Sequence, residues 1–301
     1  MNGVIHTVKP PGMTSSSLVV ALKRILNTKR VGHTGTLDPG ACGVLSVCVG
    51  RATKVADYLM SGKKTYIAGI RFGAATDTLD SYGKIIETDG SSVRIDELRN
   101  ACVSFLGEQG QIPPMYSAIK VNGQKMYQLA RQGKEILLPA RKITIYSIEL
   151  LDFDQGENSC LLRIECSKGT YIRTLCGDIA KKMDTIGYVS FLLRTQSGAA
   201  NISDAYTLNE IEELAHRGDY SFFDPVDAAL SGMKDCILED YLFPIITTGT
   251  PIDLARIKNS LGIPRKMDLR VYCGGKFIGI GRAEENTLKI KTMIYIGGEE
   301  D

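Results

Sequence analysis

Asp38 is the first residue whose type and setting could support chemistry. It is the one acidic residue in the segment 1–54, which carries seven lysines and arginines, and it lies in the glycine- and threonine-rich stretch 31–42. Neighbouring bases stabilise an ionised carboxylate, and an ionised carboxylate held in a loop can act as a nucleophile or as a base. Asp-Pro-Gly is also a common turn sequence. The residue by itself therefore leaves a catalytic and a purely structural interpretation open.

Three further side chains suit a site that binds an anion or a nucleobase. Arg173 falls in the first turn of a helix expected over residues 169–183, where a cation opposes the helix dipole. That position suggests recruitment to a carboxylate or a phosphate, with a solvent-facing arginine as the alternative. Tyr66 lies in the middle of an expected strand, where it could pack in the core or stack on a base. His33 lies in the Asp38 loop and is by itself an ordinary polar side chain.

The distribution of charge hints at a polyanionic partner, although the net charge is only +2. Residues 111–142 carry six lysines and arginines against one acid, Glu135, whereas residues 76–110 hold seven acids and three bases. Basic segments in a balanced chain could form one face that binds nucleic acid. Ordinary solvated helix faces would explain the same charges. The segment QIPPMYSAIK (111–120) could likewise be a recognition loop for a nucleic-acid strand or a rigid turn.

Composition excludes several classes of protein. The chain is 44% hydrophobic and 23% charged, as is typical of globular proteins, and it has neither a signal-peptide pattern nor an apolar run near the ~18 residues that span a bilayer. Its eight cysteines form no CxxC pair and its three histidines are far apart, so we expect a cytoplasmic protein with reduced core thiols and no structural metal. The absence of GxGxxG and Walker sequences predicts no nucleotide cofactor.

Hydrophobic periodicity predicts the elements that must position these residues. We expect helices over 14–27, 52–60, 94–106, 169–183 (capped by Thr170) and 207–218, and strands over 43–49, 64–73, 141–153, 159–166 and 188–199. Strands and helices do not alternate regularly. This pattern favours an α+β fold, with a mixed, largely antiparallel sheet decorated by helices, over a doubly wound parallel sheet.

The composition changes near residues 230–233. Beyond this point, short apolar stretches alternate with Gly and Pro turns, and ten bases balance ten acids. We therefore expect two domains, a catalytic domain over 1–231 and a small β-rich domain over 232–301.

Several blocks of sequence, taken together, resemble one family. GHTGTLDPGACGVL (32–45) resembles the catalytic-loop motif of the pseudouridine synthases, in their TruB branch. Further blocks resemble that branch in the same order: NGVIHTVKPPGMTS (2–15), KTYIAGIRFGAATDTLDSYG (64–83), QIPPMYSAIKVNGQKMYQLARQG (111–133) and CSKGTYIRTL (166–175). The third of these is similar to the inserted thumb of the branch, here about 111–140. The segment from Met233 onward more weakly resembles the small PUA-like RNA-binding domain.

The resemblance implies an enzyme that flips uridine 55 out of the TΨC loop of tRNA and isomerises it to pseudouridine without a metal or other cofactor. Asp38 is the implied nucleophile, Arg173 its ion-pair partner, and Tyr66 the aromatic residue that stacks on the target base. The substrate-binding residues carried over by motif are His33, Tyr171 and Leu192; Leu193 stands where relatives often carry a second arginine.

The implied partner is the T-arm of tRNA, bound by a monomer that requires no protein partner. Two other functions remain open at this point. One is an RNA-folding protein that remodels the tRNA elbow without chemistry, for which Asp38 would have no use. The other is a guide-RNA-dependent relative that modifies ribosomal RNA within a complex. The thumb-like segment 111–133 favours direct recognition of tRNA.

Overall fold

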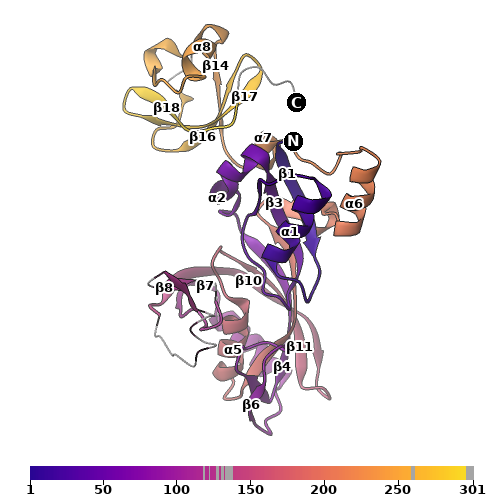
Figure 1. Ribbon diagram of the computed structural model, residues 1–301. Coiled ribbons are helices and arrows are strands. Elements are labelled where there is room, and N and C mark those ends of the chain that lie inside the picture. The colour runs from indigo at the N-terminus through magenta and orange to yellow at the C-terminus, as the bar shows by residue number, and fades with distance from the viewer. Residues whose placement is uncertain are drawn as a thin grey trace.

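A nine-stranded sheet carries most of the chain, and a separate five-stranded sheet carries its C-terminal part (Figure 1). The computed structural model describes residues 1–117, 119–121, 123–126, 129, 132, 138–258 and 262–295. In Figure 1 the five-stranded sheet lies at one end of the molecule. β1 and β3 lie in the middle of the molecule, and β4, β11 and α5 lie toward the other end.

The larger sheet has the strand order β1-β3-β12-β4-β11-β10-β7, with β2 paired to β3 and β13 paired to β12. Its strands are β1 (Gly3–Lys9), β2 (Val31–His33), β3 (Cys42–Val49), β4 (Lys64–Phe72), β7 (Gly107–Gln111), β10 (Arg141–Asp154), β11 (Ser159–Cys166), β12 (Gly187–Ser197) and β13 (Ala200–Asn201). Every pairing in it is antiparallel except that between β3 and β12. The sheet therefore consists of two antiparallel parts joined by one short parallel contact.

Helices cover this sheet and the connections between its strands. They are α1 (Ser15–Ile25), α2 (Ala56–Leu59), α3 (Ile95–Ser104), α5 (Ile172–Lys182), α6 (Leu208–His216) and α7 (Val226–Ala229), with 3₁₀ turns at Gly50–Val55 and Ile202–Asp204. The apolar stripe of α1, including Leu18 and Leu22, and that of α5, including Leu175 and Ile179, are buried in one continuous core. Spacing of three and four residues places these side chains on a single helix face.

The smaller sheet has the order β14-β16-β17-β18-β15. Its elements are β14 (Asp235–Leu238), β15 (Ile252–Asp253), β16 (Asp268–Cys273), β17 (Lys276–Glu284), β18 (Thr287–Met293) and α8 (Phe243–Ile246), with 3₁₀ turns at Asp240–Leu242 and Leu254–Arg256. An apolar cluster that includes Val4, Cys48, Leu230 and Ile280 joins this unit to the larger sheet. Arg51 also donates a hydrogen bond to the Ile294 carbonyl at 3.1 Å, so the two units are packed against each other.

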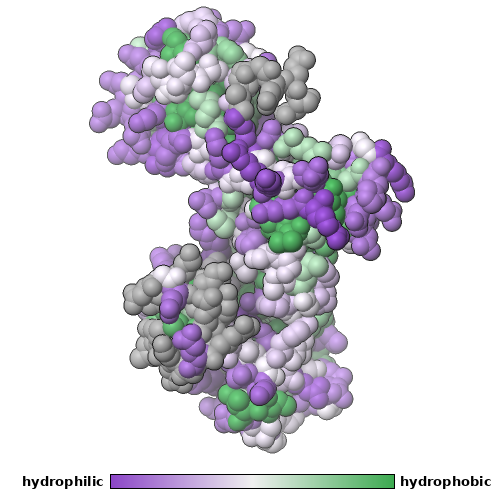
Figure 2. All heavy atoms as spheres, in the orientation of Figure 1, coloured by the Kyte–Doolittle hydropathy of each residue, from purple (hydrophilic) through white to green (hydrophobic). Residues whose placement is uncertain are grey.

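Two small hairpins complete the described fold: β5 (Ala74–Thr76) with β6 (Ile85–Thr88), and β8 (Lys120–Val121) with β9 (Gln124–Lys125). Figure 2 shows an apolar patch at the end of the molecule that carries β6, where the side chains of Ile85 and Ile86 are exposed. The thumb-like insertion predicted over 111–140 lies partly outside the described residues. No described helix is long and apolar enough to cross a membrane.

The α+β fold predicted from periodicity, with its β-rich C-terminal region, is confirmed, whereas the division at residue 231 and the PUA-like assignment stay predictions. The helix predicted over 52–60 begins as a 3₁₀ turn, and the loop predicted over 31–42 begins with β2.

The predicted Thr170 cap of α5 is wrong. Tyr171 occupies the N-cap position without a side-chain cap, and the Thr170 hydroxyl donates to the Ser167 carbonyl at 2.9 Å, so it caps no helix amide. All eight cysteines are free, and seven of them are buried.

Candidate active site

A cavity of about 570 Å³ opens beside the parallel contact of β3 and β12. Its walls come from the β2–β3 loop, β4, β12, the start of β10, and the connection from β11 into α5. The lining residues that concern the chemistry are Asp38, Lys64, Tyr66, Tyr171, Arg173, Leu192 and Arg194. The fold thus brings together side chains that are up to 156 positions apart in the sequence (38 to 194).

The close approach of β3 and β12 depends on a glycine. Gly43 has a φ of +111°, and a Cβ atom added there would lie 2.2 Å from the carbonyl oxygen of Arg194. Only glycine combines that backbone conformation with such a contact. The Arg194 guanidinium then crosses the junction, and its Nε donates to the Val44 carbonyl at 2.9 Å. Gly43 therefore permits the close approach of the two strands beside the cavity.

The loop that carries Asp38 is fastened by side chains from the N-terminal segment. The buried hydroxyl of Ser15 donates to the Leu37 carbonyl at 3.1 Å and accepts from the Leu37 amide at 3.0 Å. The Lys9 ammonium donates to three backbone carbonyls, among them that of Pro39 at 3.3 Å. Burial lowers the pKa of Lys9 to about 8. These contacts hold the backbone on both sides of Asp38, so the position of its carboxylate is defined before any ligand binds.

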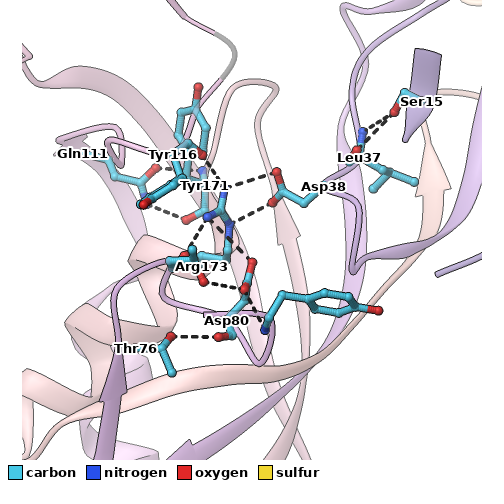
Figure 3. Close-up of polar contacts among 11 residues, drawn as sticks. Ser15, Leu37, Asp38, Thr76, Asp80, Gln111, Tyr116, Tyr171 and Arg173 are labelled. Atoms are coloured by element: carbon cyan, nitrogen blue, oxygen red, sulfur yellow. Dashed lines mark hydrogen bonds and ion pairs between the residues drawn. The ribbon is translucent and has the colours of Figure 1, made fainter. Parts of the chain in front are cut away.

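Arg173 forms a two-pronged ion pair with Asp38 (Figure 3). Its Nε lies 2.8 Å from Asp38 Oδ2, and its Nη2 lies 3.1 Å from Asp38 Oδ1. Nη1 also donates to the Thr78 carbonyl at 2.7 Å, and Nη2 donates to the Tyr116 carbonyl at 2.8 Å. The side chain of Arg173 is only 4% exposed, whereas that of Asp38 is 36% exposed. A rigid buried cation thus orients a carboxylate that remains open to the cavity.

Asp80 is a second acid near Arg173 that the sequence analysis did not single out. Its Oδ2 lies 3.8 Å from Arg173 Nη1, while its Oδ1 accepts from the Thr78 hydroxyl at 2.6 Å and from the Tyr82 amide at 3.1 Å. The residue ends the run TDTLD, and the acids in that short run were a signal available in the sequence. Asp80 thus lies near Nη1, the one nitrogen of the guanidinium that does not contact Asp38 (Figure 3).

Tyr66 and Leu192 lie on neighbouring strands and line the same cavity. Burial raises the pKa of the Tyr66 hydroxyl, and the Arg194 guanidinium beside it opposes that rise. A tyrosine hydroxyl is protonated at neutral pH at its ordinary pKa, and the raised pKa leaves it so. An aromatic ring and an aliphatic side chain in one cavity can enclose a flat heterocycle.

Tyr171 also lines the cavity, at the N-cap of α5. The Gln111 side chain accepts from the Tyr171 amide at 2.8 Å and donates to its carbonyl at 3.0 Å, which ties the start of α5 to β7. Burial raises the pKa of the Tyr171 hydroxyl. His33 is different: it ends β2, five residues before Asp38, and it is not among the described residues that line the cavity.

The cavity is strongly basic, and of its cations the sequence analysis indicated only those of the segment 111–142. Beyond Arg173, five further cations line the same space, of which Lys142 pairs with Glu108: Lys64, Arg141, Lys142, Lys168 and Arg194. Lys64 precedes Tyr66 by two residues, so strand periodicity was a signal that both share a face. Among the described residues, no group of three or more His, Cys, Asp and Glu side chains could hold a metal ion. The arrangement suits an anionic, ring-containing ligand.

Comparison with known proteins identifies a family and individual relatives that this chain resembles in sequence. Residues 23–172 match the family model described as "TruB family pseudouridylate synthase (N terminal domain)". The chain is 41% identical over 303 residues to tRNA pseudouridine synthase B of Alkaliphilus oremlandii, covering 100% of both chains. It is 42% identical over 292 residues to tRNA pseudouridine synthase B of Clostridium kluyveri, covering 96% of this chain and 98% of that one.

Solved structures share the fold. One is the structure of an H/ACA RNP bound to a substrate RNA containing 2′-deoxyuridine, with a TM-score of 0.74 at 23% identity, covering 98% of this chain and 85% of that one. Another is the crystal structure of a Cbf5-Nop10-Gar1 complex, with a TM-score of 0.72 at 25% identity, covering 94% of this chain and 79% of that one.

Proposed function

The chain belongs to the TruB family of pseudouridine synthases, and we therefore propose that it isomerises uridine 55 in the TΨC loop of tRNA to pseudouridine, with Asp38 as the nucleophile. The observation that carries this proposal is the ion pair of Asp38 and Arg173, which faces Tyr66 across one cavity. The pair supplies an oriented carboxylate, and the tyrosine supplies a flat apolar face for the base.

The isomerisation breaks the N1–C1′ bond, turns the freed uracil, and joins C5 to C1′, with loss of the C5 proton and uptake of a proton at N1. No electron is gained or lost overall. Three routes use an ionised carboxylate at this point: attack of Asp38 at C1′, attack at C6, or removal of a proton from the ribose. Each route needs the buried Arg173 to keep the carboxylate aimed. Each also needs walls that retain the detached base, which Tyr66 and Leu192 provide.

The target uridine lies within a folded RNA loop and has to leave its stack before it can enter the cavity. The basic lining, from Lys64 to Arg194, suits the phosphates of the extruded nucleotide and its neighbours. His33 lies outside the cavity but close to Asp38 in sequence, so its proposed role is to contact the RNA loop beside the flipped nucleotide. Recognition of tRNA by a monomer without a protein partner is part of the same proposal.

The relatives favour free tRNA as the substrate of the reaction over an RNA bound within a guide-RNA complex. The matched tRNA pseudouridine synthases are about as long as this chain and 41–42% identical to it, whereas the chain is 23–25% identical to the proteins in the H/ACA RNP and Cbf5 complexes. We take the first group as the model for the substrate.

The proposal is tested by release of tritium from C5-labelled uridine in an unmodified tRNA transcript, because bond formation at C5 expels that hydrogen. Wild type should release tritium from a transcript with uridine at position 55 and should not do so when that position is substituted. Asp38→Asn keeps the side chain's size but removes its charge, so it should abolish release while binding stays within about tenfold of wild type.

Two results would contradict the proposal. Turnover by Asp38→Asn near the wild-type rate would exclude the nucleophile assignment. Tight binding by wild type without any tritium release would favour an RNA-folding function instead.

A further inference from the structure

Lys64 is a buried cation without a partner. It begins β4, its residue is 7% exposed, and its Nζ is buried with no hydrogen-bond partner in the described structure. Burying a charge without a partner is costly. The side chain nevertheless lines the active-site cavity, on the same strand face as Tyr66. An ammonium in this position is stabilised when a negative group enters the cavity.

The groups around Lys64 do not neutralise it. Arg194 faces it from β12 and Lys168 from the loop after β11, and both are cations. The Cys166 thiol on β11 is held protonated, because burial raises its pKa to about 12. Burial, reinforced by Arg194 and Lys168, lowers the pKa of Lys64 to about 8, which still leaves it mostly protonated at neutral pH. Asp38 is the one carboxylate among the described lining residues, and Arg173 already binds both of its oxygens.

We propose that the Lys64 ammonium is the counter-charge for the negative charge that the uracil ring acquires during the reaction. This inference rests on the proposed isomerisation. Because Lys64 and Tyr66 share one face of β4 and line the same cavity, the Lys64 side chain belongs to the same wall as the ring that would hold the base. Lys64 would therefore act on the reacting heterocycle, whereas Arg173 acts on the nucleophile.

The charge follows from the bond changes. When the N1–C1′ bond breaks, its electron pair stays on N1 and is shared with the O2 and O4 carbonyls. C1′ then bonds to an Asp38 oxygen, or C2′ loses a proton to it, and the free uracil carries one negative charge. If Asp38 adds to C6 instead, the same charge appears on O4 of the enolate. The ring is neutral again once C5 bonds to C1′, and the proton that C5 then loses is balanced by a proton taken up at N1. A fixed cation in a site sheltered from water stabilises the charged stage more than the neutral ones.

The test compares two leaving groups, uracil and 5-fluorouracil. A T-arm hairpin with uridine at the target position is set against one with 5-fluorouridine, whose fluorine withdraws electrons and stabilises the ring anion without any protein cation. Loss of the starting nucleoside from each hairpin is followed by liquid chromatography of the nuclease digest under single-turnover conditions with saturating enzyme, because pseudouridine has the same mass as uridine and 5-fluorouridine carries no hydrogen at C5 to release. The variants are Lys64→Met, which keeps the length but not the charge, and Lys64→Arg, which keeps the charge. Lys63→Met is the matched control, because Lys63 is exposed and pairs with Glu165.

Lys64→Met should slow conversion of uridine by about 100-fold or more, with hairpin affinity unchanged. The factor by which Lys64→Met slows the reaction of the 5-fluorouridine hairpin should be at least about tenfold smaller, because the better leaving group needs less stabilisation. Lys64→Arg should restore part of the rate, and Lys63→Met should behave as wild type.

Three outcomes would overturn the inference: Lys64→Met at the wild-type rate, equal slowing with both bases, or a loss that appears as weaker hairpin binding. The last would make Lys64 a phosphate contact. A wild-type protein that fails to convert the uridine hairpin at all would instead contradict the proposed function, so the two failures are distinguishable.

Discussion

At the scale of the residue, Arg173 shows how one buried side chain organises the site. Its guanidinium has four hydrogen bonds, two to Asp38 and one each to the carbonyls of Thr78 and Tyr116. Only a planar fork of donors can satisfy these directions at once, so a lysine could not replace it. The hydrogen bonds to these two carbonyls hold the guanidinium in place, so it cannot move with the Asp38 carboxylate. Asp38 therefore meets a fixed cation, and its orientation is set by the protein.

Arg173→Ala should lower turnover far more than it lowers RNA affinity. The variant leaves the carboxylate without its counter-charge, and we expect a loss of about 10²–10³-fold in kcat. Arg173→Lys should recover little of that loss, because one ammonium cannot replace both prongs. Tritium release at saturating tRNA gives kcat, and a filter-binding titration gives Kd. If Arg173→Ala weakened binding and left kcat intact, Arg173 would be a phosphate contact and not the partner of the nucleophile.

At the scale of the element, the position of Asp38 depends on the start of α1. Ser15 is the first residue of that helix, and its one hydroxyl satisfies both the amide and the carbonyl of Leu37. Thr14 caps the helix by accepting from the Ser17 amide at 2.9 Å, which fixes where the helix begins. The cap, the helix and the Asp38 loop thus form one hydrogen-bonded unit. The loop is held by a helix that begins 22 residues before Leu37.

Ser15→Ala should destabilise the protein and slow it. Two buried backbone groups of Leu37 lose their partner, at a cost of about 1–3 kcal/mol in the free energy of unfolding. Asp38 is the next residue, and a shift of about 1 Å in its carboxylate would reduce turnover by up to about 100-fold. Urea unfolding and tritium release measure the two effects. Ser16→Ala, at an exposed position of the same helix, is the control; equal effects of both changes would show that the Leu37 contacts do not matter.

At the scale of the whole molecule, the two sheets share an apolar contact. Ile280 lies in the smaller sheet and is fully buried among residues of the larger unit that include Val4 and Cys48. Arg270 adds a hydrogen bond from the smaller sheet to the Asp227 carbonyl at 2.7 Å. An interface that is buried in this way couples the stability of the two units and restricts their relative motion.

Ile280→Ala should lower the free energy of unfolding by about 2–5 kcal/mol, because it removes a buried side chain and leaves a cavity at the junction. Urea unfolding followed by circular dichroism measures this change. Ile237→Ala is the control, since Ile237 belongs to the same sheet but is 74% exposed; its effect should stay within about 0.5 kcal/mol. If the two variants were equally stable, the junction would contribute nothing to holding the units together.

The sequence by itself indicated the elements and the candidate site residues. Periodicity indicated α1, α5, α6 and strands β3, β4, β10, β11 and β12 to within a few residues, because these patterns depend on side chains only two to four positions apart. The sequence blocks that resemble one family pointed to Asp38, Tyr66 and Arg173. The structure brings these three residues to one cavity.

Only the tertiary structure decided how those residues act on one another. The resemblance implied the Asp38–Arg173 pair, but no local pattern specifies that these residues, 135 positions apart, will pack together with this two-pronged geometry. The same holds for Asp80 behind Arg173, for the Gly43 contact with Arg194, and for His33, which ends outside the cavity. Burial of Lys64 is likewise a property of all the chain around it, since desolvation sums over every neighbour. Residue type is local, whereas charge state, partner and exposure are set by the packed whole.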